Sequence, residues 1–192
     1  MNAVLRNLAY GVGLVAVLAA TAAAQTLPWK EKYDDSTGEG GPTVVAGLGR
    51  PVRLHDMEWR FGGITEGKPQ KSFSPPLPPR TRVAVVVFSV KPLTPAASQW
   101  FTGASGDCSI QVTDRRNRVW SPSTRSDLAP PGGNEAGCKA DDANFKPKPL
   151  AVGQERKIQK EFVVPQDAFS ALQVQIRLAM RPGTVRMSPQ PR

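Results

Sequence analysis

Apolar and polar residues alternate in several short runs between residues 43 and 187, with the two-residue period of a β-strand. The clearest run is residues 172–178, where Leu, Val, Ile and Leu alternate with Gln, Gln and Arg. This pattern predicts strands with one face in a core and the other in solvent. We expect strands at residues 43–46, 51–61, 82–90, 108–113, 119–120, 156–164, 172–178 and 184–187.

One run differs from the others because residues 82–90 are apolar at nearly every position. A strand that is buried on both faces has such a continuous apolar run. We therefore predict that this strand is central in its sheet, and that Val85, Val87 and Phe88 are deeply buried.

The connections between strands follow from local breaks in the pattern. The apolar positions of residues 51–61 shift phase at His55 and Asp56, which predicts a bulge within one strand. Residues 114–117 predict a hairpin turn with Asn117 in the left-handed conformation. Residues 62–79 and 121–152 are rich in Pro and Gly and are predicted loops, and residues 165–170 predict a turn or a single helical turn that packs Phe169.

No amphipathic helical pattern follows the N-terminal segment. Strands with one apolar face each must bury those faces against one another. The fold class predicted is therefore all-β: an antiparallel sandwich of six to eight strands, preceded by one N-terminal hydrophobic helix. A closed barrel is the alternative.

The N-terminal segment, residues 1–29, contains Arg6 and then no charged side chain up to Lys30. Its length suits a helix that crosses a bilayer, with Trp29 at the interface and the N-terminus in the cytoplasm. Arg6, the apolar core and the alanines of residues 22–24 also suit a secretory signal that is cleaved after Ala24. Both interpretations place the rest of the chain outside the cytoplasm, as a flexible tether (30–42), a sandwich domain (43–187) and a tail (188–192).

The chain has two cysteines, Cys108 and Cys138, and one histidine. In an exported chain, two cysteines most simply form one disulfide. A zinc site is disfavoured because the paired ligand spacing of such sites is missing. We therefore predict a disulfide that ties the 121–152 loop back to the strand beginning at Cys108.

The net charge is +9, which would suit a partner such as an anionic envelope polymer or lipid headgroups. The positive residues are dispersed, however, so that a solvated basic surface explains them as well. Their densest group is Arg115, Arg116 and Arg118.

Four segments together resemble the immunoglobulin-like domains of exported and membrane-anchored bacterial proteins of the actinobacterial type. In such domains an apolar strand carries the core, an Asp-x-x-Gly-x-x-Trp turn follows, and a strand with Phe and Pro comes near the end. Here Asp114 and Trp120 match the turn motif, with Asn117 near the place of the glycine. The resemblance implies a sandwich fold and carries over no catalytic residue. The segments are LPPRTRVAVVVFSV (77–90), CSIQVTDRRNRVW (108–120), VGQERKIQKEFVVP (152–165) and LQVQIRL (172–178).

No catalytic, metal or cofactor site is predicted. His55 and Asp56 are neighbours in a predicted strand and would point to opposite faces. The acidic pairs at residues 34–35 and 141–142 lack the ligand spacing of a calcium loop. We therefore do not expect an enzyme.

Trp100 and Phe101, in a predicted loop, could form a contact surface or pack beneath the loop. Arg115, Arg116 and Arg118 could add a basic contact surface, while Trp59 and Trp120 are expected in the core. The function expected is that of a non-enzymatic, membrane-tethered domain that contacts an unknown envelope protein or ligand. The alternative is a basic domain that binds an anionic envelope polymer or lipid headgroups; nucleic acid is not an expected partner.

Overall fold

The computed structural model describes residues 40–68, 75–101, 108–125, 127–128, 138, 149–179 and 181–189. The predicted membrane segment and most of the predicted tether lie outside these ranges. Within them, no helix combines the length and hydropathy needed to cross a membrane. The first strand begins at Thr43 and the last one ends at Ser188.

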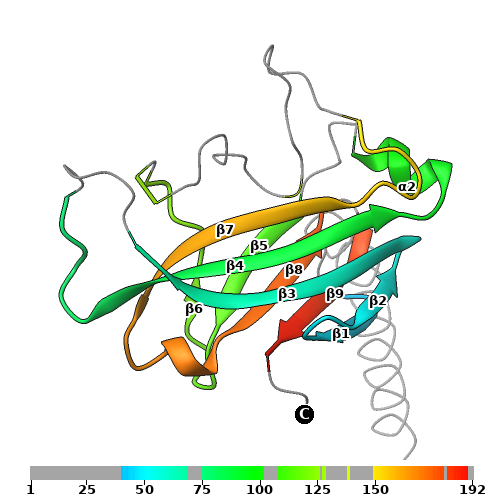
Figure 1. Cartoon of the computed structure of the whole chain (residues 1–192). Coiled ribbons are helices and arrows are strands. Elements are labelled where there is room, and N and C mark those ends of the chain that lie inside the picture. Colours follow the sequence, from blue (N-terminus) through cyan, green and yellow to red (C-terminus); the bar gives the residue numbers. More distant parts are fainter. Residues whose placement is uncertain are drawn as a thin grey trace, which may run out of the picture.

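Two stacked β-sheets form a sandwich (Figure 1), which confirms the predicted two-layer fold. The described residues form nine strands, one more than the upper estimate, and β1 runs parallel to β9, so that one sheet is mixed. In spatial order, the five-stranded sheet is β1 (Thr43–Gly47), β9 (Arg181–Ser188), β8 (Gln173–Leu178), β5 (Cys108–Thr113) and β6 (Val119–Trp120). The four-stranded sheet is β2 (Pro51–Leu54), β3 (Met57–Gly67), β4 (Thr81–Pro92) and β7 (Arg156–Pro165).

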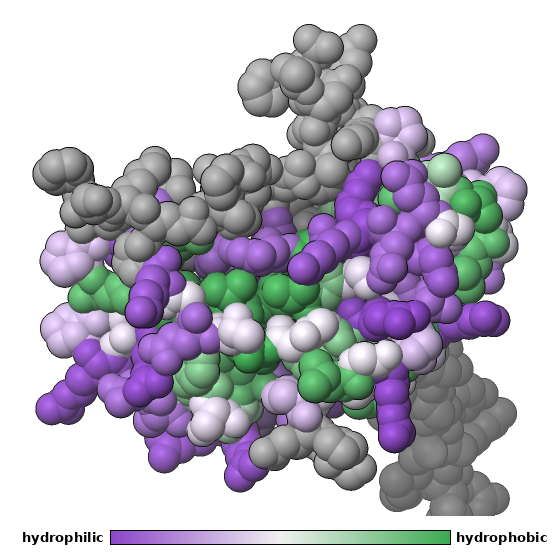
Figure 2. Space-filling view, viewed as in Figure 1, coloured by the Kyte–Doolittle hydropathy of each residue, from purple (hydrophilic) through white to green (hydrophobic). Residues whose placement is uncertain are grey.

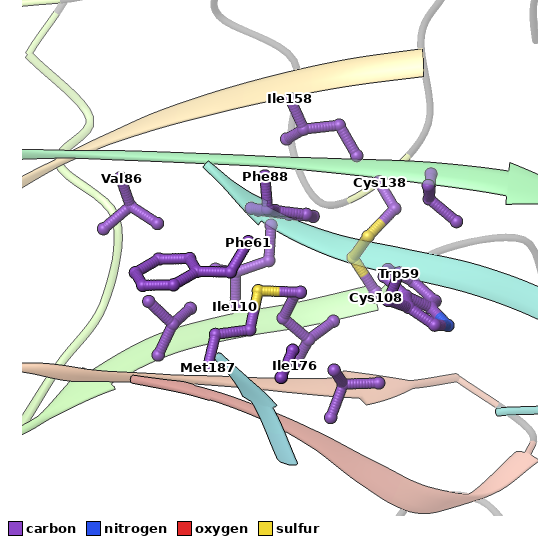
Figure 3. Close-up of a cluster of buried hydrophobic side chains, with 14 of the residues drawn as sticks. Trp59, Phe61, Val86, Phe88, Cys108, Ile110, Cys138, Ile158, Ile176 and Met187 are labelled. Carbon is purple, nitrogen blue, oxygen red and sulfur yellow. A yellow bond between two sulfur atoms is a disulfide. The ribbon is translucent and has the colours of Figure 1, made fainter. Parts of the chain in front are cut away.

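The core lies between the sheets and is built from the alternating positions of their strands (Figure 3). The apolar residues of β8 are all buried, as the alternation predicted. Trp59 of β3 is completely buried, whereas Trp120 of β6 is half-buried at the margin of the core. The central position of β4 between β3 and β7 is also confirmed.

The predicted burial of β4 holds for Phe88, which is 1% exposed, but is wrong for Val85 and Val87. Ala84, Val86 and Phe88 point into the core, while the two valines are half-buried on the outer face. An apolar run shows no period, so that it cannot tell which face of a strand is fully covered.

His55 and Asp56 form a two-residue turn and not the predicted bulge. Both have left-handed backbones (φ 53° and 58°), and Leu54 pairs with Met57 across the turn. Two positive φ angles define the turn that best matches the twist of a hairpin. The strand that follows, β3, continues to Gly67 through a bulge after Phe61, so the beginning of the predicted 62–79 loop is a strand.

Two short helical elements join the sheets. The first, α2 (Pro95–Trp100), lies where a loop was predicted. The Thr94 hydroxyl accepts a hydrogen bond from the N–H of Ala97 at 3.3 Å, and Pro95 occupies the first turn, where its missing N–H costs nothing. The second, η1 (Phe169–Ala171), is the predicted helical turn, and Phe169 packs against the core.

Candidate functional site

The predicted basic turn between β5 and β6 is organised by Asp114. Its Oδ1 accepts the backbone N–H groups of Arg116 (2.9 Å) and Arg118 (3.0 Å), and its Oδ2 accepts the Nε–H of Arg118 (2.8 Å). Asn117 has φ 58° and donates its N–H to the Asp114 carbonyl (3.0 Å), which confirms its left-handed conformation. The backbone of the turn is thus fixed by one buried carboxylate.

The charges of Asp114 and Arg118 stabilise each other. Burial opposes ionisation of Asp114, but the hydrogen bonds from the Arg118 side chain and from the N–H groups of Arg118 and Arg116 outweigh it and lower the pKa of Asp114. The bonds to Asp114 and then Asp167 raise the pKa of Arg118. Asp114 therefore holds the turn together and is not free to bind a partner.

A second carboxylate, Asp167, connects this turn to the opposite sheet. Its Oδ2 lies 3.0 Å from Arg118 Nη2 and 3.4 Å from Arg116 Nη1. Asp167 lies just after β7 and its side chain is 53% exposed. The guanidinium of Arg118 also lies 5.4 Å from the centre of the Trp120 ring. Two of the three arginines that the sequence singled out, Arg116 and Arg118, therefore bridge the two sheets at one end of the sandwich.

A pocket of about 640 Å³ opens beside Asp167. Arg80, at the start of β4, lies in its wall, and the Arg80 carbonyl accepts the N–H of Gln166 at 2.9 Å. Arg82 is near by, with its guanidinium 5.8 Å from the centre of the Phe169 ring. The pocket is lined by Pro79, Arg80, Thr81, Pro165, Gln166 and Asp167.

We call the resulting surface the arginine end: Arg80, Arg82, Arg115, Arg116 and Arg118. Three described carboxylates accompany it, namely Asp114, Asp167 and Glu66, the last of which pairs with Arg82 at 3.0 Å. Positive charge is thus in excess. Sequence reasoning found three of the five arginines. It missed Arg80 and Arg82, because they reach this place only through the pairing of β4 with β7.

Trp100 and Phe101 do not form the contact surface that was one of their two predicted roles. Trp100 is 5% exposed and Phe101 is completely buried. Their rings meet edge to face at 4.9 Å, and the indole N–H of Trp100 donates to the carbonyl of Ala179 at 3.4 Å. The pair therefore takes the packed alternative and belongs to the buried core.

Cys108 and Cys138 form a disulfide, and both cysteines are buried in the core beside Trp59 (Figure 3). His55 has a structural contact, because its Nε2 lies 2.7 Å from the carbonyl oxygen of Pro182. No cluster of three or more His, Cys, Asp or Glu that could hold a metal ion occurs in the described part of the chain.

No family model matches the chain, and no curated protein matches it. The solved structures of several bacterial proteins show a distant similarity to this chain. An uncharacterized β-sandwich protein from Clostridium difficile 630 has a TM-score of 0.43 and 10% identity, over 79% of this chain and 96% of that one. A conserved hypothetical protein from Bacillus anthracis has a TM-score of 0.44 and 12% identity, over 70% and 94% of the two chains. The yjhA protein of Bacillus subtilis has a TM-score of 0.38 and 6% identity, over 68% and 78%.

Proposed function

We propose that this chain is a non-enzymatic binding domain with an immunoglobulin-like sandwich, held outside the cytoplasm by its N-terminal segment, and that it contacts an envelope protein through the arginine end. Export is supported by the buried disulfide, since such bonds persist in oxidising compartments. The contact is supported by one observation: five arginines from both sheets gather beside a pocket at one end of the fold.

The strand register places this surface far from the point where the tether joins. Thr113 pairs with Gln173 and precedes the β5–β6 turn, so both lie near the arginine end. Val174 pairs with Met187, and the next residue, Ser188, pairs with Gly47, so β1 ends toward the same end of the sheet although it is the opposite edge strand. Thr43 lies at the other end of the same sheet. A domain held at Thr43 would therefore present its arginines away from the attachment point.

The chemistry of the arginine end favours a partner with exposed carboxylates. A guanidinium binds a carboxylate through two parallel N–H bonds, and its charge is permanent. Asp114 is committed to the turn, but Asp167 is exposed and shared between Arg116 and Arg118. A carboxylate of the partner can take one of these guanidinium groups from Asp167, or bind Arg80 in the pocket wall.

Cross-linking in native membranes tests the proposed contact. The full chain carries R80Q and R116Q, and the matched control carries R50Q and R53Q, two exposed arginines outside the arginine end that give the same net charge. Loss of a specific cross-linked protein in the first variant and its retention in the control are expected. Equal loss in both variants would show that overall charge, and not this surface, governs the contact.

The orientation is tested separately by adding protease to intact cells stripped of their wall. We expect the domain to be released or digested. Protection of the domain would overturn the proposed location. A mature protein that begins at Gln25 and is found in the medium would instead establish the cleaved, secreted form.

A second candidate, binding of an anionic envelope polymer, is favoured by the outer face of the five-stranded sheet. The outward positions of β5, β8 and β9 carry Arg177 and Arg186 but no Asp or Glu, and the others are mostly Gln, Thr and Ser. Dextran sulfate, with neutral dextran as control, tests this candidate. R177Q/R186Q should weaken binding and flatten its salt dependence more than R50Q/R53Q does. Equal effects would assign binding to net charge alone.

A further inference from the structure

Three side chains form one row across the outer face of the four-stranded sheet. Ser89, on the central strand β4, pairs with Arg60 of β3 on one side and with Lys157 of β7 on the other. Directly paired residues have Cβ atoms about 4.5–5.5 Å apart. A hydroxyl group therefore lies between two cationic residues, one on each neighbouring strand, and all three residues line one pocket.

A carboxylate of the chain itself reaches this row. The hydroxyl of Ser89 donates a hydrogen bond to Oε1 of Glu155, which lies just before β7. Arg60 has a second carboxylate near it, since its Nη2 lies 3.5 Å from Oε1 of Glu58. Glu58, however, makes a shorter ion pair with Lys91 (2.7 Å), which holds it in the next row of the sheet. Glu155 therefore marks the place where the row accepts a carboxylate.

An apolar floor continues from the row along β4. Val87 and Val85 lie half-buried on this face, and Figure 2 shows an apolar strip along the middle of the sheet between hydrophilic residues. Gly62 of β3 leaves Val87 uncovered because it has no side chain. A Cβ at this position would lie only 3.0 Å from Cγ1 of Val87 and would cover it. A pocket of about 300 Å³ spans the row and the start of this floor.

We propose that this pocket binds a linear alkyl chain that ends in a carboxylate, as in a fatty acid. The ligand carboxylate replaces that of Glu155 on Ser89, between Arg60 and Lys157, and the alkyl chain lies over Val87 and Val85. Four residues of a strand span roughly 13 Å, which gives room for a chain of medium length. The site lies on a different face from the arginine end, so it can fail or stand independently of the proposed function.

The position of β4 argues against a peptide as the occupant. A peptide that binds along a sheet adds to an exposed strand edge through backbone hydrogen bonds. Both edges of β4 are already paired, with β3 and with β7. What remains above β4 is a narrow apolar surface with an anion-binding end at Ser89. It is bordered on β7 by Gln159 and by Glu161, whose Oε1 accepts a hydrogen bond from Gln159 at 2.9 Å. An alkyl carboxylate fits this surface with its charge at the Ser89 end, away from Glu161.

The proposal is tested with a photoreactive decanoate that carries a diazirine in its chain, added to the full-length protein in its membrane, followed by peptide mapping. We expect insertion at residues of β3 or β4 near Val87. Decanoate should compete and decanol should not, because decanol lacks the charge. Labelling elsewhere, or equal competition by decanol, would overturn the proposal. Equal competition by an apolar peptide with a free C-terminus would overturn the choice of occupant.

Two variants with opposite expected effects on decanoate binding keep the test independent of folding defects. R60Q/K157Q should weaken decanoate binding roughly tenfold or more, since it removes both charge-assisted interactions. E155Q should strengthen binding, because it removes the competing internal charge. R53Q, an exposed arginine on the neighbouring strand β2, should leave binding unchanged. If E155Q binds no better than the unaltered chain, Glu155 does not occupy the ligand site and the proposal fails.

Discussion

Cys138 is bonded to Cys108, the first residue of β5, across a separation of 30 residues and with a Cα–Cα distance of 5.4 Å. This bond is the covalent link between the connection that follows β6 and the core. Both cysteines are buried, so that the link is part of the packed interior.

Removal of this disulfide by the double substitution C108A/C138A should lower the free energy of unfolding by roughly 3–4 kcal/mol, because the unfolded chain regains the freedom of a closed loop. Urea unfolding of the two proteins measures the difference. Thiol labelling of the denatured, non-reduced natural protein is the companion measurement. Two free thiols in the exported chain would refute the bond.

Substitution of Phe88, on the core side of β4, should be far more costly than substitution on the outer side. F88A should lower the free energy of unfolding by about 3–5 kcal/mol, the usual range for a buried aromatic side chain. V85A, three residues away and half-buried, should cost clearly less. Similar thermal melts for the two variants would show that β4 does not distinguish its faces as described.

Asn117 is held in a left-handed backbone that other L-residues adopt at a cost of about 1–2 kcal/mol. N117G should therefore leave stability nearly unchanged, while N117V should lose about that amount. R115V, in the same turn but without a positive φ, controls for the loss of a polar side chain. Thermal melts of the three variants test this, and a large loss in N117G would contradict it.

The lowered pKa of Asp114 predicts an acid-sensitive turn. A carboxylate whose pKa is lower in the folded state stabilises the fold at pH values above its ordinary 3.8, and this stabilisation is lost as the pH falls through the folded-state pKa. D114N should therefore melt at a lower temperature than the natural protein at pH 7. This gap in melting temperature between the two proteins should narrow as the pH is lowered below about 4. A gap that is constant with pH would mean that ionisation of Asp114 contributes nothing.

The β2–β3 hairpin shows where the sequence pattern is ambiguous. Leu54 and Met57 are an odd number of positions apart but face the same core. A bulge in one strand and a two-residue turn between two strands both produce that spacing. The usual composition of such turns, Asn or Asp followed by Gly, is absent at His55 and Asp56, so the turn carried no familiar signal. The two-layer fold itself was predictable, because alternation fixes which face of each strand is apolar.

Sequence patterns are limited in a similar way for surfaces such as the arginine end, because they show only residues that are close along the chain. Arg115, Arg116 and Arg118 are adjacent in sequence and were found for that reason. Asp167, which joins two of them, lies about 50 residues further along and has no local signal. Trp100 is the last residue of a helix that begins at Pro95, after the capping residue Thr94, and Phe101 is its C-cap. A capping residue followed by proline is a known helix start signal, and it is the local signal in the sequence that points to this helix.

The parallel pairing of β1 with β9 has a mechanical consequence. In a domain held by its N-terminal segment and bound at the opposite end, tension enters at Thr43 and runs along β1. The pairs from Thr43–Thr184 to Gly47–Ser188 lie side by side across that direction. The hydrogen bonds between β1 and β9 then bear the force together and must break at the same time. A strand pulled perpendicular to its length would instead lose its hydrogen bonds one after another. The first strand of the fold thus has the geometry of a clamp, at the point where a pulled chain would otherwise begin to unravel.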